Sequence, residues 1–417
     1  MNRSLLREKL RREEKLKVLF LNDIGFQYGA GMAHLRQIQS FLLMGHEVKG
    51  VCWGQGIEGN IPFVPHQSRG VWKGMLQLSQ VHQDQGYTEA DIVQAVLREV
   101  ISIDPDVIIV GNLHGARWPI SLLEALGKLD ALTVAYMHDC YYISGRCAYP
   151  GQCRLYETGC DERCLTADKY PPLDRSKIAE AWQLRRRIFC GRNGLPLATN
   201  SRWTLGMAQR NLSNLFYADV VYLGLDEDLF KPIDRLLARR LLRIPDNRFV
   251  VLCGAVNLSD KRKGGHLLKQ IVSALSKKVL FLMFGAESER LKGVMPTGLI
   301  RDYRKMPLLY SAADIFLGTA LEEAFGQTLC EAAACELPVV AFNVGGVPEI
   351  ARHDMNARLV NQFSARGAID EIGFFMDNTS KRREYGRAGR EIVTRQFSLM
   401  KQGERWMEYL RKVASLE

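Results

Sequence analysis

The chain has 417 residues, of which 47% are hydrophobic and 24% are charged, and its formal net charge at pH 7 is +10. A chain of this length exceeds the size at which one hydrophobic core keeps growing, so we expect two domains. No apolar run approaches the roughly 20 residues of a membrane-spanning helix, and the charged N-terminal stretch does not have the form of a signal peptide. The composition therefore predicts a cytoplasmic protein.

The positive charge suits nucleic acid, an anionic membrane or a phosphorylated substrate. The sequence has no run of aromatic residues interleaved with basic ones and no nucleic-acid-binding motif, so we predict no nucleic-acid partner. Basic residues gather in four segments, which are either solvated helix faces or, in part, a peripheral contact with the cytoplasmic face of a membrane. These segments are 3–17, 185–187, 235–243 and 261–263.

The first half of the chain alternates apolar strands with helical stretches. An apolar strand at 16–22 is followed by a glycine turn at 28–31 and then by a helix-period stretch at 32–44. A strand, a glycine turn and a helix in this order are typical of a doubly wound domain. Further strands are predicted at 48–53, 105–110 and 132–137, the last two being continuous apolar runs typical of buried parallel strands.

A second series of strands begins near residue 247 and again alternates with helical stretches, which predicts a second Rossmann-like domain. Its strands are predicted at 249–255, 279–285, 313–317 and 338–342, after a linker at 222–226. The predicted domains are 1–222, with a cysteine-rich insertion at about 140–170, and 223–396, followed by an amphipathic helix in 397–417.

The segment 319–350 carries the strongest chemical signal. Glu323 and Glu331 lie either side of a tight turn that opens a helix, whose first N–H groups can face a diphosphate. Glu331, about one turn into the helix, suits ribose hydroxyls, and Glu323 precedes the turn, where it can reach a transferred sugar. The residues of this tight turn are Phe325, Gly326, Gln327 and Thr328. The alternative interpretation is that both glutamates merely flank an amphipathic helix.

A second glycine turn, at 343–349, directly follows the apolar strand 338–342. With its two glutamates separated by seven residues, the block resembles the donor-binding signature of family 4 retaining glycosyltransferases of the GT-B fold, in particular bacterial polysaccharide-assembly members. The resemblance implies two Rossmann-like doubly wound domains facing a central cleft. It also implies an acceptor-side first domain, a second domain that binds a nucleotide sugar, and a C-terminal helix that crosses back to the first domain.

A basic loop at 260–265 follows the first strand of the second domain, where ligands of an open parallel sheet bind. The resemblance places the family's phosphate-binding lysine at Lys263. The family's arginine falls at Ala255, which is a departure. We expect Arg262 to supply the missing charge, because a guanidinium binds phosphate in a bidentate manner.

Histidines end two strands of the first domain. A lone histidine in such a place is more often structural, but by resemblance His138 is the active-site histidine near the reacting carbon, so His138 and Glu323 are the predicted catalytic residues. His114 resembles a second pocket residue. Gly29 and Gly31 would let the backbone approach the acceptor or the sugar phosphate, although the full dinucleotide pattern is absent.

Two groups of side chains raise the question of a metal. The acid pairs at 104–106 and 226–228 precede a strand and lie in the linker, so we interpret both as solvated turns and expect no catalytic metal. Four cysteines lie within eighteen residues, and they form either a closed structural zinc site or unbound thiols in an insertion. These are Cys147, Cys153, Cys160 and Cys164.

The sequence thus predicts a retaining transferase that moves a sugar from a nucleoside-diphosphate sugar to a hydroxyl of a glycan, a lipid-linked saccharide or a small acceptor, in polysaccharide or glycoconjugate biosynthesis. Three alternatives remain: a non-catalytic nucleotide-sugar-binding or assembly protein, a nucleotide-sugar epimerase, and a dehydrogenase, which the missing glycine fingerprint disfavours. The identity of the sugar, the base and the acceptor does not follow from the fold.

Overall fold

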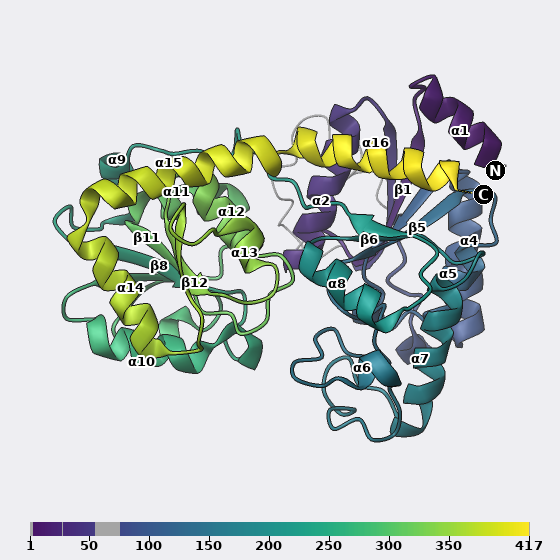
Figure 1. Ribbon diagram of the computed structural model, residues 1–417, viewed down its shortest axis with the longest axis horizontal. Helices are drawn as coiled ribbons and strands as arrows, with labels where there is room; N and C mark the ends of the chain where they lie inside the picture. Colours follow the sequence, from purple (N-terminus) through teal and green to yellow (C-terminus); the bar gives the residue numbers. More distant parts are fainter. Residues whose placement is uncertain (1–2, 27, 55–75, 417) are drawn as a thin grey trace. The chain divides into compact units, whose positions relative to one another are not determined.

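The computed structural model describes residues 3–26, 28–54 and 76–416. The chain divides into two compact units, Met1–Gly224 with Gln402–Glu417 and Leu225–Lys401. Each unit contains one sheet whose named strands all pair in parallel, with helices on its faces (Figure 1). The prediction of an α/β chain with two doubly wound domains is therefore confirmed.

The first unit has a seven-stranded sheet in the order β3-β2-β1-β4-β5-β6-β7. The chain starts in the middle of the sheet, moves outward through β2 and returns to β4, so the strand order reverses between β1 and β4. In such sheets ligands bind beyond the carboxyl ends of the strands near this reversal. The strands are β1 (Lys17–Ile24), β2 (Glu47–Gly54), β3 (Leu76–Gln77), β4 (Val107–Val110), β5 (Leu132–Met137), β6 (Leu197–Thr199) and β7 (Ala218–Val220).

Alternate residues of β1 point to opposite faces of this sheet, as the strand geometry requires. Leu19 and Leu21 join a core cluster with α4, α5, α7 and α8. On the other face, Phe20 packs edge to face against Phe41 of α2, and Phe41 contacts Trp406 of α16. The helices are α1 (Arg3–Arg11), α2 (Tyr28–Leu43), α4 (Glu89–Ile103), α5 (Ser121–Leu126), α6 (Leu155–Thr158), α7 (Arg175–Phe189), α8 (Arg202–Asn211) and α16 (Leu399–Ser415), with short 3-10 turns at Gln83–Gln85 and His114–Ala116.

The second unit has a six-stranded sheet in the order β10-β9-β8-β11-β12-β13, which reverses between β8 and β11. Its four inner strands are apolar and largely buried on both faces, as expected for parallel strands between two helix layers. The strands are β8 (Val250–Gly254), β9 (Leu280–Phe284), β10 (Val294–Gly298), β11 (Ile315–Gly318), β12 (Val339–Phe342) and β13 (Ala357–Val360).

Two helix layers cover the second sheet. Buried side chains of α10 and α14 join β8, β9 and β11 in one core cluster. In the other layer, α11 contacts both α9 and α12, and α12 also contacts α15. The helices are α9 (Arg235–Leu242), α10 (Gly265–Leu275), α11 (Met306–Ala312), α12 (Gln327–Ala334), α13 (Val347–Ile350), α14 (Ala365–Asp377) and α15 (Thr379–Gln396), with short 3-10 turns at Lys261–Lys263, Ser288–Arg290 and Tyr303–Lys305.

The predicted glycine turn before the first helix is wrong. Tyr28, at a φ of 56°, begins α2, so Gly29 and Gly31 lie in the first helical turn. A Cβ on Gly31 would lie 1.9 Å from the carbonyl oxygen of Gly25. The glycine is therefore explained by the close approach of this helix to the loop that follows β1, and not by a turn conformation.

The interpretation of Asp106 as part of a solvated turn is also wrong. Asp106 is 7% exposed, and its carboxylate accepts hydrogen bonds from Lys9 Nζ at 2.7 Å and from the backbone N–H of Lys17 at 2.9 Å. A buried carboxylate needs hydrogen-bond partners, and Lys9 and Lys17 supply them. Asp106 thus connects α1 to β1 at the amino end of the first sheet.

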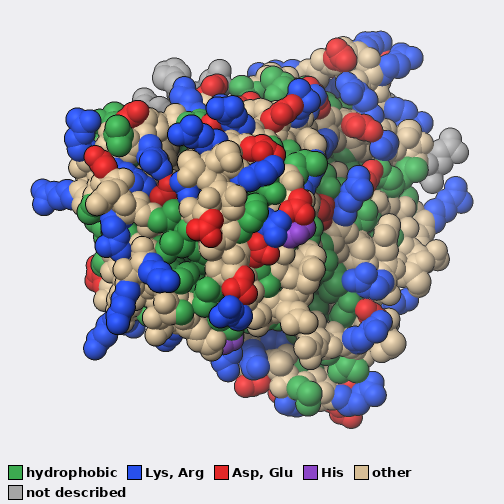
Figure 2. All heavy atoms as spheres, turned by 60° about the vertical axis from the view of Figure 1, so that its left-hand side comes forward, with side chains coloured by type: hydrophobic (Ala, Val, Ile, Leu, Met, Phe, Trp, Pro, Cys, Tyr) green, Lys and Arg blue, Asp and Glu red, His purple; other side chains and the backbone are tan. Residues whose placement is uncertain are grey.

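On the face that Figure 2 shows, Lys and Arg side chains are scattered over much of the surface, and fewer Asp and Glu side chains lie among them. None of the helices in the described part of the chain is both long and apolar enough to cross a membrane. Peripheral membrane contact and cytoplasmic location stay predictions.

Candidate functional site

The loops beyond the carboxyl ends of β8 and β11 bring together two predicted site residues that lie 60 positions apart. Lys263 ends the 3-10 turn after β8, and Glu323 lies in the loop between β11 and α12. Lys263 Nζ lies 2.8 Å from Glu323 Oε2, and the two side chains are 28% and 21% exposed. Burial alone would raise the pKa of the Glu323 carboxyl, but Lys263 and then Arg262 outweigh it and hold the pKa below its ordinary value. Glu323 is therefore a carboxylate paired with a partly accessible ammonium group.

Arg262 has an acidic partner in its own turn. Its guanidinium forms an ion pair with Asp260, whose carboxylate also accepts the backbone N–H of Arg262 and so caps the 3-10 turn. The positive charge of Arg262 also helps to hold the pKa of the Glu323 carboxyl below its ordinary value. The replacement of the missing family arginine by Arg262 stays a prediction.

The predicted turn lies at the start of α12. Gly326 is the N-cap residue, with a φ of 100°, and it has no side chain to cap the first N–H groups of the helix. Gln327 and Thr328 are the first two helical residues, while Phe325 is buried and packs edge to face against Phe397. The positive end of the helix dipole thus lies a few residues after Glu323 in the chain, an arrangement that favours an anion.

Glu331 lies on the buried part of α12, with 9% of its surface exposed. Its Oε2 accepts a hydrogen bond from the hydroxyl of Tyr310 on α11 at 2.8 Å. Tyr310 is fully buried, so the carboxylate is fixed from inside the domain. Sequence reasoning missed Tyr310, because no motif links an aromatic residue on the preceding helix to this glutamate.

The turn between β12 and α13 supports the backbone of Glu323. The N–H of Gly346 donates to the carbonyl oxygen of Glu323 at 2.9 Å. Gly345 has a φ of 56°, and a Cβ there would lie 1.9 Å from the same oxygen. The second glycine turn of the motif therefore positions the loop that carries Glu323.

In the first unit, His138 directly follows β5 and is 7% exposed. Its ring packs edge to face against Tyr136, and its Nε2 is buried with no hydrogen-bond partner. Burial lowers the pKa of this imidazole to about 4, although the nearby charge of Asp139 acts in the opposite direction. His138 is thus a neutral imidazole at neutral pH.

The other predicted histidine of this edge is hydrogen-bonded on both nitrogens. His114 Nε2 lies 3.1 Å from Asp139 Oδ2, and His114 Nδ1 lies 2.8 Å from the hydroxyl of Tyr170. Burial opposes the charged form of His114, but Asp139 outweighs it and raises the pKa of the imidazole. Sequence reasoning noted the histidines that follow these strands but gave no role to Asp139 or to Asp23 in β1.

The four cysteines of the insertion are free thiols. The Sγ of Cys147 accepts from Arg146 Nη1 at 3.2 Å, and the pKa of Cys160 is raised to about 12, mainly by burial and in part by the other three cysteines, Cys147, Cys153 and Cys164. No group of three or more His, Cys, Asp or Glu side chains in the described part of the chain is arranged to hold a metal ion. The structural zinc site therefore stays a prediction.

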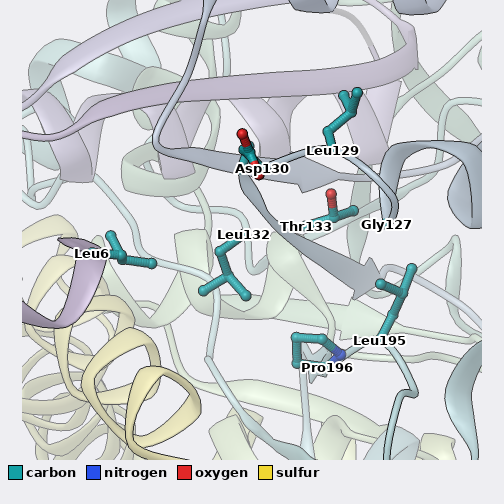
Figure 3. Close-up of a pocket in the computed structure, with 9 residues that line it drawn as sticks. Leu6, Gly127, Leu129, Asp130, Leu132, Thr133, Leu195 and Pro196 are labelled. Atoms are coloured by element: carbon teal, nitrogen blue, oxygen red, sulfur yellow. The ribbon is translucent and has the colours of Figure 1, made fainter. Parts of the chain in front are cut away.

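A pocket lies at the opposite, amino edge of the first sheet (Figure 3). Most of its lining side chains are hydrocarbon, including Leu6 of α1 and Leu132 at the start of β5, and Asp130 is its one ionisable side chain. It lacks converging polar groups, and it lies away from the carboxyl ends of the strands, where ligands of such sheets bind.

The two parallel, doubly wound sheets define a GT-B fold. Solved structures share this fold over nearly the whole chain: sucrose-phosphate synthase from Thermosynechococcus elongatus (18% identical, TM-score 0.71, 97% of this chain and 100% of that one) and Anabaena HepE in complex with UDP-glucose (18% identical, TM-score 0.67, 95% and 100%). WaaG, a glycosyltransferase involved in lipopolysaccharide biosynthesis, is 16% identical with a TM-score of 0.67, covering 94% of this chain and 99% of that one.

Sequence similarity names the family. Residues 238–392 match the family described as glycosyl transferases group 1, which agrees over this part of the chain with the family that the sequence resembles. The D-inositol 3-phosphate glycosyltransferase of Mycobacterium bovis is 30% identical over 161 residues, which are 34% of this chain and 32% of that relative. The match thus spans about a third of the relative's length.

Proposed function

We propose that the protein transfers a sugar from a nucleoside-diphosphate sugar to an acceptor hydroxyl with retention of configuration. The contact between Lys263 and Glu323, 2.8 Å apart before the start of α12, carries this proposal. A diphosphate that binds Lys263 and the N–H groups of α12 places the attached sugar within reach of Glu323. The ammonium group and the helix dipole stabilise the charge that develops on the departing diphosphate.

Three further residues support the proposal. Glu331 is held by Tyr310, and a carboxylate is a suitable acceptor for ribose hydroxyls. Arg262 lies close enough to Glu323 to lower its pKa and so adds positive charge near the phosphates. His138 is neutral and has an unpartnered nitrogen, which suits a residue that orients a sugar hydroxyl.

The relatives suggest the kind of donor and process. HepE was solved with UDP-glucose, and WaaG acts in lipopolysaccharide biosynthesis. On this basis we propose a UDP-sugar as donor and a glycan, a lipid-linked saccharide or a small polyol as acceptor, in the biosynthesis of a polysaccharide or glycoconjugate.

The test is the variant Glu323→Gln, which keeps the shape of the side chain and removes its charge. We expect the rate of UDP release from UDP-glucose, with or without acceptor, to fall by about 100-fold, because the donor loses the group that positions its sugar. The melting temperature should change little, since the lost ion pair is partly exposed.

A matched control is Glu371→Gln. Glu371 pairs with Arg358 at 2.6 Å in the same unit, and its side chain is also 21% exposed. The control should keep its activity. Equal rates in wild type and Glu323→Gln would contradict the catalytic role. UDP binding without any sugar transfer or hydrolysis would favour a non-catalytic nucleotide-sugar-binding protein.

A further inference from the structure

The short helix α9 presents its apolar side chains to the solvent. Leu236 and Leu237 are each 47% exposed, and Leu241 is 63% exposed. Ile233, which lies just before the helix, is 36% exposed. No other stretch of nine residues in the described part of the chain holds more than two exposed large hydrophobic side chains. Single exposed leucines are common on proteins, but these four together, which we call the α9 face, indicate a surface that binds a partner.

The inward side of the same helix carries a buried charge. Each residue of an α-helix is turned by about 100° from the previous one, so Ala238 and Arg239 lie opposite the leucines. Arg239 is 1% exposed. Its guanidinium donates to the carbonyl oxygens of Ala312 at 3.0 Å and Asp246 at 2.7 Å, and it pairs with the carboxylate of Asp314 at 2.8 Å. These contacts fix the rotation of α9, so the leucines cannot turn inward.

Both ends of the helix are fixed as well. The carboxylate of Asp234 caps the first turn by accepting the backbone N–H of Leu237 at 2.8 Å, and Arg243 ends the helix with a φ of 56°. The backbone N–H of Ile233 donates to the hydroxyl of Ser311 on α11 at 3.0 Å. The α9 face is therefore a fixed part of the folded unit.

Positive charge surrounds the α9 face. Arg240 lies on the outward side of the helix among the leucines and is exposed. Lys231 before the helix and Arg243 at its end are exposed as well. Asp234 is the only acidic residue of the segment 231–243, and its carboxylate is used to cap the helix. Leucines with exposed basic residues among them complement an anionic lipid surface, because the leucines enter the interface and the cations attract the headgroups.

The small area of the α9 face distinguishes between a membrane and a second copy of the chain. A helix of eight residues is about 12 Å long and roughly 10 Å wide, so its outer side covers on the order of 120 Å². Each partner in a stable protein–protein interface contributes about 800 Å². A peripheral membrane contact needs only the shallow insertion of a few side chains together with electrostatic attraction.

Within the second unit, the anchor of α9 lies far from the donor site in the sheet. Asp314, which holds Arg239, directly precedes β11, and it also accepts the backbone N–H of Val250 at the start of β8. α9 is thus anchored at the amino edge of the second sheet, whereas Lys263 and Glu323 lie in loops beyond its carboxyl edge. Binding at one edge leaves the other edge accessible.

We propose that the α9 face binds the surface of an anionic membrane. Its leucines enter the boundary between headgroups and acyl chains, and Lys231, Arg240 and Arg243 contact the lipid phosphates. The proposal goes beyond the proposed glycosyl transfer and does not depend on it, because lipid binding needs no turnover. It assigns to the second unit a surface for reversible attachment to a membrane.

The experiment measures sedimentation of the full-length protein with vesicles. One set is made of phosphatidylcholine alone, and the other of phosphatidylcholine mixed with an equal part of phosphatidylglycerol. We expect the protein to bind the anionic vesicles more tightly than the neutral ones, and added salt to weaken this binding.

Two variants separate the apolar and the electrostatic contributions. Leu237→Gln combined with Leu241→Gln should lower the partition coefficient on anionic vesicles by at least about tenfold, because two apolar side chains no longer leave water. Arg240→Gln should lower it about fivefold, the usual effect of one basic residue near such a surface. The melting temperature should stay at the wild-type value, since the substituted side chains are exposed.

Leu165→Gln and Arg366→Gln are the matched controls. Leu165 is 86% exposed, the side chain of Arg366 is 82% exposed, and both lie outside α9. The two controls should sediment with anionic vesicles as the wild type does. They show whether any exposed leucine or arginine has the same effect.

The inference is overturned if the wild type does not bind anionic vesicles, or if the double leucine variant and Arg240→Gln both bind them as tightly as the wild type. A concentration-dependent dimer that the double leucine variant lacks, without vesicle binding by the wild type, would also overturn it and would make the α9 face an interface between copies. UDP binding is measured separately, so its absence would count against the proposed function and not against lipid binding.

Discussion

The pKa values of three buried histidines in the first unit are displaced in opposite directions. It lowers the pKa of His138 to about 4 and that of His34 well below its ordinary value. The pKa of His114 is instead raised, because Asp139 outweighs burial. His138 and His34 are therefore neutral imidazoles in the folded protein at neutral pH, whereas the pairing with Asp139 favours the charged form of His114.

The stability of the first unit should consequently depend on pH. Between about pH 6.5 and 4 the unfolded chain protonates His138 while the folded chain does not, so the free energy of unfolding falls as the pH falls, by at most about 1.4 kcal/mol per pH unit. Above pH 6.5 both states are neutral and the contribution disappears. His34 acts with the same sign, whereas His114 contributes stability that is lost as the pH rises.

His138→Gln isolates the contribution of one histidine. Between pH 6.5 and 4.5, urea unfolding should show that the variant loses roughly 2 kcal/mol less stability than the wild type. His353→Gln is the control, because that ring is on the surface, with 46% of its side chain exposed. If His138→Gln and wild type had parallel pH profiles, the folded imidazole would not be held neutral.

The sequence allowed the family motif to be recognised at the residue scale, but it did not show which side chains meet. The spacing of Glu323 and Glu331 follows from the chain alone, whereas the contact of Glu323 with Lys263 joins residues 60 positions apart. The pair of His114 and Asp139 likewise depends on side chains from two different strand ends. Such pairs depend on side-chain direction at the sheet edge, which a single sequence does not specify.

At the scale of elements, apolar runs predicted the long strands well. The run at 132–137 coincides with β5, and the predicted strand at 249–255 contains β8. Three-residue strands such as β6 are too short to show a periodicity. β10 contains Pro296, which is tolerated because this strand lies at the edge of its sheet.

The turn between β12 and α13 provides a test at this scale. Gly345→Ala places a Cβ against the carbonyl oxygen of Glu323 at a positive φ, so the loop that carries Glu323 must move. We expect a loss of about 1–3 kcal/mol in stability and at least a tenfold loss of UDP-glucose hydrolysis. Denaturant unfolding and the UDP-release assay measure the two effects.

Gly373→Ala is the control for this substitution. Gly373 lies inside α14, and a Cβ there meets no atom within 4 Å. Since alanine favours a helix by about 1 kcal/mol over glycine, the control should be as stable as the wild type or more stable. An active Gly345→Ala enzyme would show that the turn does not position Glu323.

At the scale of the whole molecule, the C-terminal helix links the two units in sequence. α16 begins at Leu399, within the second unit, and from Gln402 onward the chain belongs to the first unit. Trp406 is fully buried there and lies 5.8 Å from Phe41 and 5.6 Å from Tyr136 between ring centroids. The last turns of the chain thus complete the core on one face of the first sheet.

Removing this side chain should therefore destabilise one unit and spare the other. We expect Trp406→Ala to cost about 3–5 kcal/mol and to speed hydrogen exchange in β1 and β5, while β8 and β11 keep their protection. Met400→Ala, at a position of the same helix that is 43% exposed, should change neither set of strands. Equal loss of protection in all four strands of Trp406→Ala would mean that the two units unfold as one cooperative body, so that core mutations in the first unit would also reduce donor binding in the second.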